Sequence, residues 1–216
     1  MKRIKGLFLI LAAAMLLGAC ATPLLYSARE IRGQIVDAET SQPIEGVVIV
    51  AQWVLFEMGP GSGGHKGRLH IHETVTDQDG RYAIPAWGPK PHSPFTELLD
   101  RSPDLLIFKS GYEPLALSNH RVSNESVRTS DWDGRVIKLQ QYKQPASNYA
   151  RDIRSRIVFS LPTSSYAWRE YPRMVLALHA EELRLRKLGA RSGILMISVE
   201  HLGDADNSGQ QGNPFS

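Results

Sequence analysis

Residues 46–56 read GVVIVAQWVLF, and this stretch decides the class of fold. Its β-branched and aromatic side chains are typical of a strand. Apolar residues follow one another without the alternation of a half-buried strand, which indicates burial on both faces. Further short strands are expected at residues 31–36, 69–76, 81–84, 105–109, 112–117 and 135–139, with turn-forming residues between them. The pattern predicts a mainly β protein, an antiparallel β-sandwich.

The alternation in residues 69–76 predicts two different faces for this strand. Asp77-Gln78-Asp79-Gly80 follows it and predicts a tight hairpin turn in which Gly80 takes a positive φ. The Pro-rich residues 85–94 cannot form a central strand, because proline has no N–H to donate. One face of residues 69–76 is expected to carry Leu69, Ile71, Glu73 and Val75, and the other His70, His72, Thr74 and Thr76.

Three short motifs indicate a family. They are IRGQIVD at residues 31–37, QPIEGV at 42–47 and TVTDQDGRY at 74–82. Together they resemble the carboxypeptidase regulatory-like domain, a transthyretin-like, Ig-like β-sandwich. The resemblance implies that Asp77 and Gly80 are structural turn residues and that the module is not an enzyme. Intradiol dioxygenases share a related sandwich and hold iron with two Tyr and two His, but no cluster with matching spacing is found. The long insertion at residues 53–67 departs from the family pattern.

The first twenty residues, MKRIKGLFLILAAAMLLGAC, form a secretory signal with basic residues before an apolar run. The apolar run is too short to span a membrane. The signal ends at Cys20, the only cysteine of the chain, and resembles the lipobox of bacterial lipoproteins. In that family the thiol is acylated and the peptide is cut before it. The resemblance implies a signal peptide at 1–19 and a lipidated tether at 20–30. The residue after Cys20 is Ala21 and not Asp, which in Gram-negative lipoproteins implies the outer membrane, facing the periplasm or the surface.

The charge balance excludes a nucleic-acid partner. Residues 1–19 hold three of the 25 Lys and Arg, so that 22 remain against 22 Asp and Glu. A chain without net charge lacks the cationic surface that nucleic-acid binding requires. With Cys20 acylated no thiol is left for a disulfide, so the fold must rest on its apolar core.

The composition changes after residue 142. The sandwich is therefore assigned to residues 31–142, a helical extension to 143–202 and a disordered tail to 203–216. A helix is favoured over a strand at 148–159, and a strand is possible at 193–200. A firmer helix is predicted at 172–188, with Pro172 at its first position and Gly189 as its C-terminal cap. Its apolar face is expected to pack on the sandwich, with a position on the membrane surface as the alternative, and comprises Val175, Leu178, Leu185 and Leu188.

Two sets of residues are candidates for binding. His70 and His72 share one face of their strand, and His65 on the preceding loop can join them, a set that suits Zn²⁺ or Cu²⁺. The alternative is a solvated face of an edge strand. Trp87 in the Pro-rich segment is the best candidate for an exposed ligand platform. The expected function is a non-catalytic, membrane-anchored binding or structural module for an envelope protein or glycan. The alternative is a metal-binding envelope protein.

Overall fold

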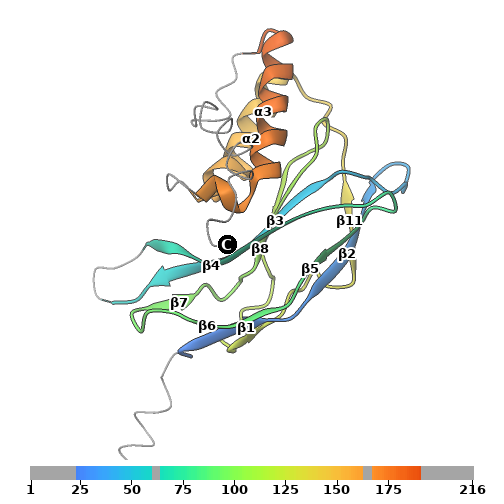
Figure 1. Cartoon of the computed structure of the whole chain (residues 1–216). Coiled ribbons are helices and arrows are strands. Elements are labelled where there is room, and N and C mark those ends of the chain that lie inside the picture. Colours follow the sequence, from blue (N-terminus) through green and yellow to red (C-terminus); the bar gives the residue numbers. More distant parts are fainter. Residues whose placement is uncertain (1–22, 60–63, 163–166, 191–216) are drawn as a thin grey trace, which may run out of the picture.

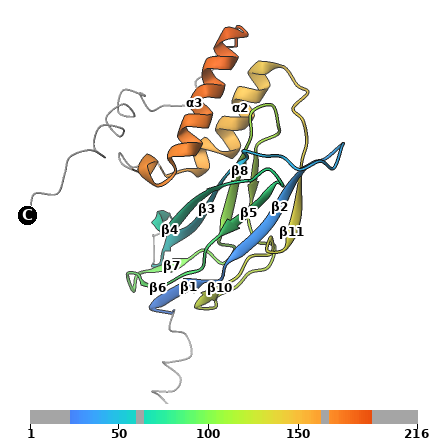
Figure 2. The same ribbon diagram turned by 45° about the vertical axis from the view of Figure 1, so that its right-hand side comes forward.

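Strand β3 (Val48–Glu57) runs through the middle of the computed structural model, which describes residues 23–59, 64–162 and 167–190 (Figure 1). The side chains of Ile49 and Trp53 lie in the core of the sandwich. Those of Val48 and Val50 lie in a second core, beneath the helices. This arrangement confirms the predicted burial on both faces. The molecule is a mainly β sandwich with a helical layer packed on the outside of one of its sheets (Figures 1 and 2).

The strands form three sheets. One has the order β4-β3-β8-β9 with β7 beside β3, the second has the order β11-β2-β5, and the third has the order β10-β1-β6. The remaining strands are β1 (Leu25–Ala28), β2 (Ile31–Asp37), β4 (His65–Val75), β5 (Arg81–Ile84), β6 (Trp87–Pro91), β7 (Thr96–Leu98), β8 (Asp104–Phe108), β9 (Leu115–Leu117), β10 (Val127–Arg128) and β11 (Arg135–Leu139). As predicted for the Pro-rich segment, β6 is an outer strand.

Pairing within the sandwich is antiparallel except at two places. The outer strand β11 pairs with β2 in parallel, with Ile137 opposite Ile35. The outer strand β10 pairs with β1 in parallel, with Arg128 opposite Ala28. Both pairs join segments about a hundred residues apart, so they close the sandwich between its first and last strands.

The segment expected to be a tether contains a strand instead. Residues 25–28 form β1, between β6 and β10. Tyr26 and Ala28 are buried in the sandwich core. Four residues were too few to show a strand pattern, and β1 is held by partners far away in the sequence. The sandwich therefore begins at Leu25 and not at Ile31, and residues 25–28 do not belong to the predicted tether.

The turn that follows β4 closes at Gly80 as predicted, but the predicted hairpin was wrong: β4 pairs with β3, and the turn leads into β5, which pairs with β2 in another sheet. Gly80 takes a φ of 68°, and its N–H donates to the Asp77 carbonyl oxygen at 2.9 Å. The Asp77 carboxylate accepts N–H groups from Asp79 and Arg81 at 3.0 and 2.8 Å. The carbonyl oxygen of Gly80 accepts the N–H of Ile35 at 2.8 Å, which ties the turn to β2. Asp77 and Gly80 are thus structural turn residues.

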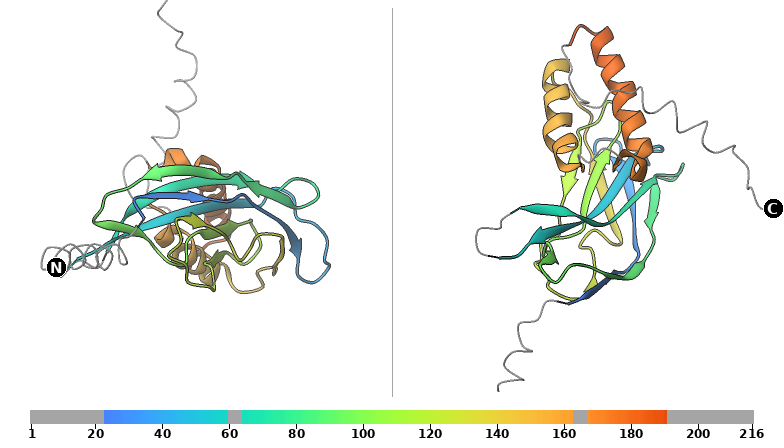
Figure 3. Two further views of the ribbon diagram at one scale, coloured as in Figure 1. Left: turned by 90° about the horizontal axis from the view of Figure 1, so that it is seen from below. Right: turned by 60° about the vertical axis from the view of Figure 1, so that its left-hand side comes forward.

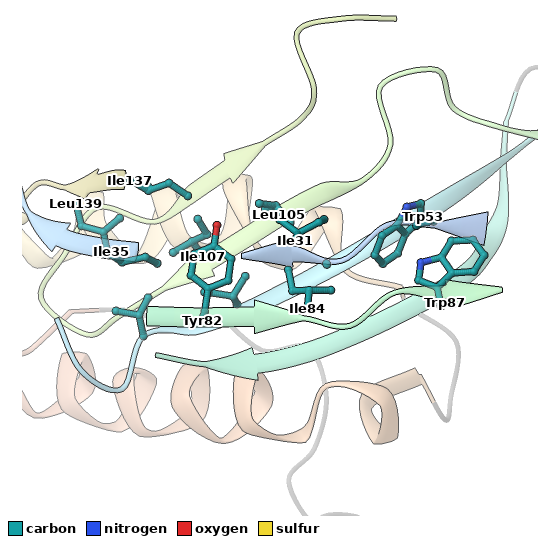
Figure 4. Close-up of a cluster of buried hydrophobic side chains, with 14 of the residues drawn as sticks. Ile31, Ile35, Trp53, Tyr82, Ile84, Trp87, Leu105, Ile107, Ile137 and Leu139 are labelled. Atoms are coloured by element: carbon teal, nitrogen blue, oxygen red, sulfur yellow. The ribbon is translucent and has the colours of Figure 1, made fainter. Parts of the chain in front are cut away.

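The inner core of the sandwich holds the apolar residues of the recognised motifs. Tyr82 and Ile84 of β5 point into it beside Ile31 and Ile35 of β2 (Figure 4). Trp53 and Trp87 close one end of this core, with their ring centroids 5.1 Å apart. Burial of these large side chains is the main source of stability for a fold without a disulfide.

Helices follow the strands, as predicted. They are α2 (Ala146–Arg156), α3 (Pro172–Lys187) and the short 3₁₀ helices η1 (Val158–Ser160) and η2 (Ala167–Glu170). Gly189 ends α3 with a φ of 77°. The buried face of α3 packs on the β3 and β8 side of the sandwich and includes Met174, Val175, Leu178 and Leu185. The prediction for Leu188 was wrong: this side chain is 62% exposed, because α3 ends one residue before it.

Several expectations fall on residues 1–22, 60–63, 163–166 and 191–216, which lie outside the described part of the chain. They are the signal peptide, acylation of Cys20, the strand at 193–200 and the disordered tail. Within the described part, no helix has both the length and the hydropathy needed to cross a bilayer.

Candidate functional site

The histidines of β4 do not form the predicted metal site with described partners. His70 and His72 lie on the same strand, and the backbone of His65 begins it. The side chain of His65 lies outside the description. Among described side chains, no three of His, Cys, Asp or Glu converge as a ligand set. The strand therefore offers a pair of imidazoles and not a completed cluster.

Lys90 lies against the first histidine of this pair. Its ammonium donates to Nδ1 of His70 at 2.9 Å. Burial, and then the charge of Lys90, lower the pKa of His70 to about 4, so its ring is neutral near pH 7. A nearby ammonium repels a divalent cation and occupies one of the two possible ligand atoms. This geometry disfavours a metal ion at His70.

Trp87 is not an exposed platform. Its side chain is only 9% exposed, and it packs edge-on against Trp53. The ring of His70 contacts both tryptophans, with its centroid 5.0 Å from that of Trp87 and 5.5 Å from that of Trp53. The neighbouring prolines suggested an exposed loop. Trp87 instead pairs with Ala28 of β1, and this pairing places its side chain inside the sandwich. The tryptophan therefore belongs to the core, and the prediction of a ligand platform was wrong.

Glu73 fastens the helical layer to the sandwich. Its carboxylate accepts the backbone N–H groups of Arg173 and Met174 at 3.0 and 2.7 Å. These groups belong to the first turn of α3, where four N–H groups have no partner within the helix. The residue before the helix, Tyr171, makes no capping hydrogen bond with its side chain. Burial raises the pKa of Glu73, and the two N–H donors partly offset that effect. A strand residue therefore caps a helix about a hundred residues away.

Replacing this cap should weaken the helical layer. We expect Glu73→Ala to lower the free energy of unfolding by about 1–2 kcal/mol, because two N–H groups lose their acceptor. Glu73→Gln keeps one acceptor oxygen and should lose less. Urea denaturation followed by tryptophan fluorescence and circular dichroism measures both. An unchanged midpoint for Glu73→Ala would show that water caps the helix equally well.

A pocket of about 310 Å³ opens beside α3, against the ends of β3 and β8. Val48, Phe108 and Ala177 give it apolar walls, and Lys109 and Arg184 bring cationic groups to it. Glu181 lines the same pocket, although its side chain is almost wholly buried. The pocket is thus apolar inside, and its charged lining consists of Lys109 and the paired Glu181 and Arg184.

The carboxylate of Glu181 is held by its neighbours. Arg184 donates to both carboxylate oxygens through Nε, at 3.0 and 3.1 Å, and the hydroxyl of Ser110 donates to Oε2. The hydrogen bond to Glu181 raises the pKa of Arg184. Glu181 therefore joins α3 to the loop after β8 and positions Arg184.

The outer face of α3 carries an apolar stripe next to this pocket. Leu176, Ala180 and Leu183 are spaced at i, i+4 and i+7 and are exposed. Such residues lie on one side of a helix. Ala180 belongs both to the stripe and to the lining of the pocket, so the two surfaces are continuous. We call this combined surface the α3 face.

Sequence reasoning did not find the α3 face. The apolar side chains of the helix were assigned to packing, which is correct for Val175, Leu178 and Leu185. Glu182 and Arg186 form an i, i+4 ion pair on the same helix at 2.5 Å. The spacing of Leu176 and Leu183 was the available signal, since neither position fits the buried side of the helix.

Comparisons with known proteins add no family. No protein-family model matches the chain, and no curated protein sequence matches it. Among solved structures, it is similar to 3-chlorocatechol 1,2-dioxygenase from Rhodococcus opacus 1CP, with 15% identity over 54% of this chain and 61% of that one, at a TM-score of 0.30. It is also similar to the group B streptococcus pilus 2b backbone protein, with 12% identity over 54% and 42% of the chains, at a TM-score of 0.31.

A third similar structure is a streptococcal ancillary pilin, with 13% identity over 56% of this chain and 31% of that one, at a TM-score of 0.28. The chain covers less than two thirds of each of these three proteins. At these scores the similarities support no functional argument. The description of the chain therefore rests on its own residues: a β-sandwich with a capped helical layer and an exposed α3 face.

Proposed function

We propose that this chain is a non-catalytic envelope lipoprotein, anchored through acylated Cys20 in the outer membrane, which binds a partner protein through the α3 face. The lipobox-like end of the signal supports the anchor, and Ala21 after the cysteine supports the outer membrane. The observation that carries the binding role is the continuity of the exposed Leu176–Leu183 stripe with the pocket beside it.

The position of the proposed anchor leaves the α3 face exposed to the aqueous compartment. Leu25 begins β1, and β1 lies at the end of the sandwich opposite to α2 and α3 (Figures 1 and 2). The same separation is visible after a further rotation (Figure 3). A chain anchored just before β1 thus points its helices away from the bilayer. The α3 face is then accessible to a partner in the aqueous compartment.

The chemistry of the α3 face favours a protein over a glycan. The stripe is aliphatic and carries no aromatic ring on which a sugar could stack. An apolar side chain of a partner can enter the pocket, and an acidic group beside it can meet Lys109. Interfaces commonly concentrate their energy in such a central anchor with charged groups around it.

Photo-cross-linking in cells tests the binding role. A benzoylphenylalanine at position 183 should give a discrete adduct, whereas the same group at Val136 should not. Val136 is a matched control, because it is an exposed apolar residue of β11 in another sheet. Leu176→Asn should reduce the adduct formed from position 183. Equal adducts from positions 183 and 136, or none from 183, would contradict a specific α3 face.

A further inference from the structure

Three large apolar side chains are exposed at the end of the sandwich that lies away from the helices. Leu24 and Leu25 are 63% and 50% exposed, and Phe95 is 71% exposed. Leu25 begins β1, and Phe95 lies in the loop between β6 and β7. We call these three side chains the apolar rim. Exposed side chains of this size mark a contact surface when they gather in one place.

The loop that carries Phe95 is fixed against the start of β1. Leu25 is paired with Pro91, at the end of β6. Nε2 of His92 donates to the carbonyl oxygen of Pro23 at 2.5 Å, and its ring stacks on Tyr26 at 4.8 Å. The chain therefore holds Phe95 near the place where residues 23–25 enter the sandwich. Both parts of the rim belong to one end of the molecule (Figures 1 and 2).

The segment between Cys20 and Leu24 is short enough to keep the apolar rim close to the membrane. Leu24 is four residues after Cys20, so the two Cα atoms can be at most about 14 Å apart. The interfacial region of one leaflet is roughly 5–7 Å thick, and apolar side chains of peripheral proteins enter it. A sandwich held on this tether must keep its rim beside the lipid headgroups.

We propose that the apolar rim of Leu24, Leu25 and Phe95 inserts into the membrane interface and fixes the orientation of the sandwich on the bilayer. This inference rests on the proposed acylation of Cys20. The occupant of the rim is lipid and not a second copy of the chain, since the tether places it within reach of the bilayer in every copy. Val127 of β10 adds apolar surface next to β1, where it pairs with Ser27.

A fluorescent probe on an introduced cysteine tests this placement. Because Cys20 is acylated in the mature protein, a cysteine at position 95 is the only free thiol. The full lipidated protein with Phe95→Cys is labelled with an environment-sensitive dye and placed in vesicles of phosphatidylethanolamine and phosphatidylglycerol. Some of these lipids carry a nitroxide near the headgroup. We expect strong quenching of the dye at position 95 and background quenching with Phe159→Cys, an equally exposed position in the helical layer.

The outcomes separate the rim from the anchor. Leu24→Ser and Leu25→Ser, added to the Phe95→Cys protein, should reduce the quenching, because both side chains are exposed and contribute only to the lipid contact. Unchanged quenching in this triple variant would overturn the inference, since the tether alone would explain it. Equal quenching at positions 95 and 159 would also overturn it, as would quenching at 95 that depends on protein density. Dye uptake by the unsubstituted protein would show a free Cys20, which contradicts the proposed function instead.

Discussion

Replacing Cys20 with serine is expected to abolish acylation and to leave the precursor uncut. Serine lacks the thiol to which the lipid is attached, and in bacterial lipoproteins the cut follows that attachment. Each acyl CH₂ that enters the bilayer contributes about 0.8 kcal/mol, so two or three chains hold a protein permanently. The effect should therefore be all or none: no incorporation of labelled palmitate, and a mass that still includes residues 1–19.

A neighbouring substitution controls for effects on export. Ala21→Ser changes a residue beside the cysteine and keeps the thiol, so it should incorporate palmitate as the unchanged protein does. Acyl labelling of Cys20→Ser at the normal level would refute the lipoprotein assignment. The dye experiment on the apolar rim would then lose its basis as well, because no short tether would hold that end of the sandwich at the bilayer.

Gly80→Ala should destabilise the sandwich by about 2–4 kcal/mol, the largest loss that we expect from a single added methyl group. Two separate effects add at this position. The φ of 68° disfavours any side chain, and a Cβ at Gly80 would lie 2.3 Å from the carbonyl oxygen of Ile35. That oxygen belongs to the backbone of β2, so relief requires a shift of the strand and weakens the hydrogen bond between Gly80 and Ile35.

Gly134 separates the two effects. Its φ of 69° is nearly the same, but a Cβ there would meet no atom within 4 Å. We expect Gly134→Ala to lose only the conformational part, about 1–2 kcal/mol. Urea denaturation of both variants gives the difference, which measures the collision with β2. Equal losses of unfolding free energy in the two variants would mean that β2 shifts to accommodate the methyl group without a measurable loss of stability.

The sequence predicted features that depend on neighbouring residues. The nearly continuous apolar run of β3 predicted its two buried faces, and the Asp77–Gly80 turn was recognisable because only certain residues adopt its backbone angles. Pro172 and Gly189 marked the ends of α3 for the same reason. Each of these features is decided within a few residues of the chain.

The features that were missed depend on contacts between distant segments. Trp87 is buried because β6 pairs with β1, a strand too short to show a pattern of its own. Glu73 looked like the polar member of an alternating strand, and only the folded chain places it under the first turn of α3. The α3 face consists of the helix residues that the sandwich leaves exposed. It could be recognised only once the residues of α3 that pack on the sandwich were known.

The pairing of β1 also determines how the protein responds to force. If Cys20 is acylated as we propose, a pull on that anchor reaches the sandwich at β1, which lies between β6 and β10. Hydrogen bonds of a sheet run across the strands, so a pull along β1 strains its bonds to both neighbours at once. Those to β10 include the bonds from Ser27 to Ser126 and from Arg29 to Arg128, both 2.9 Å long. Such shear loading resists extraction better than peeling, in which bonds break one after another. In the lipoprotein that we propose, this arrangement would let the sandwich carry tension between the bilayer and a partner bound at its helical end.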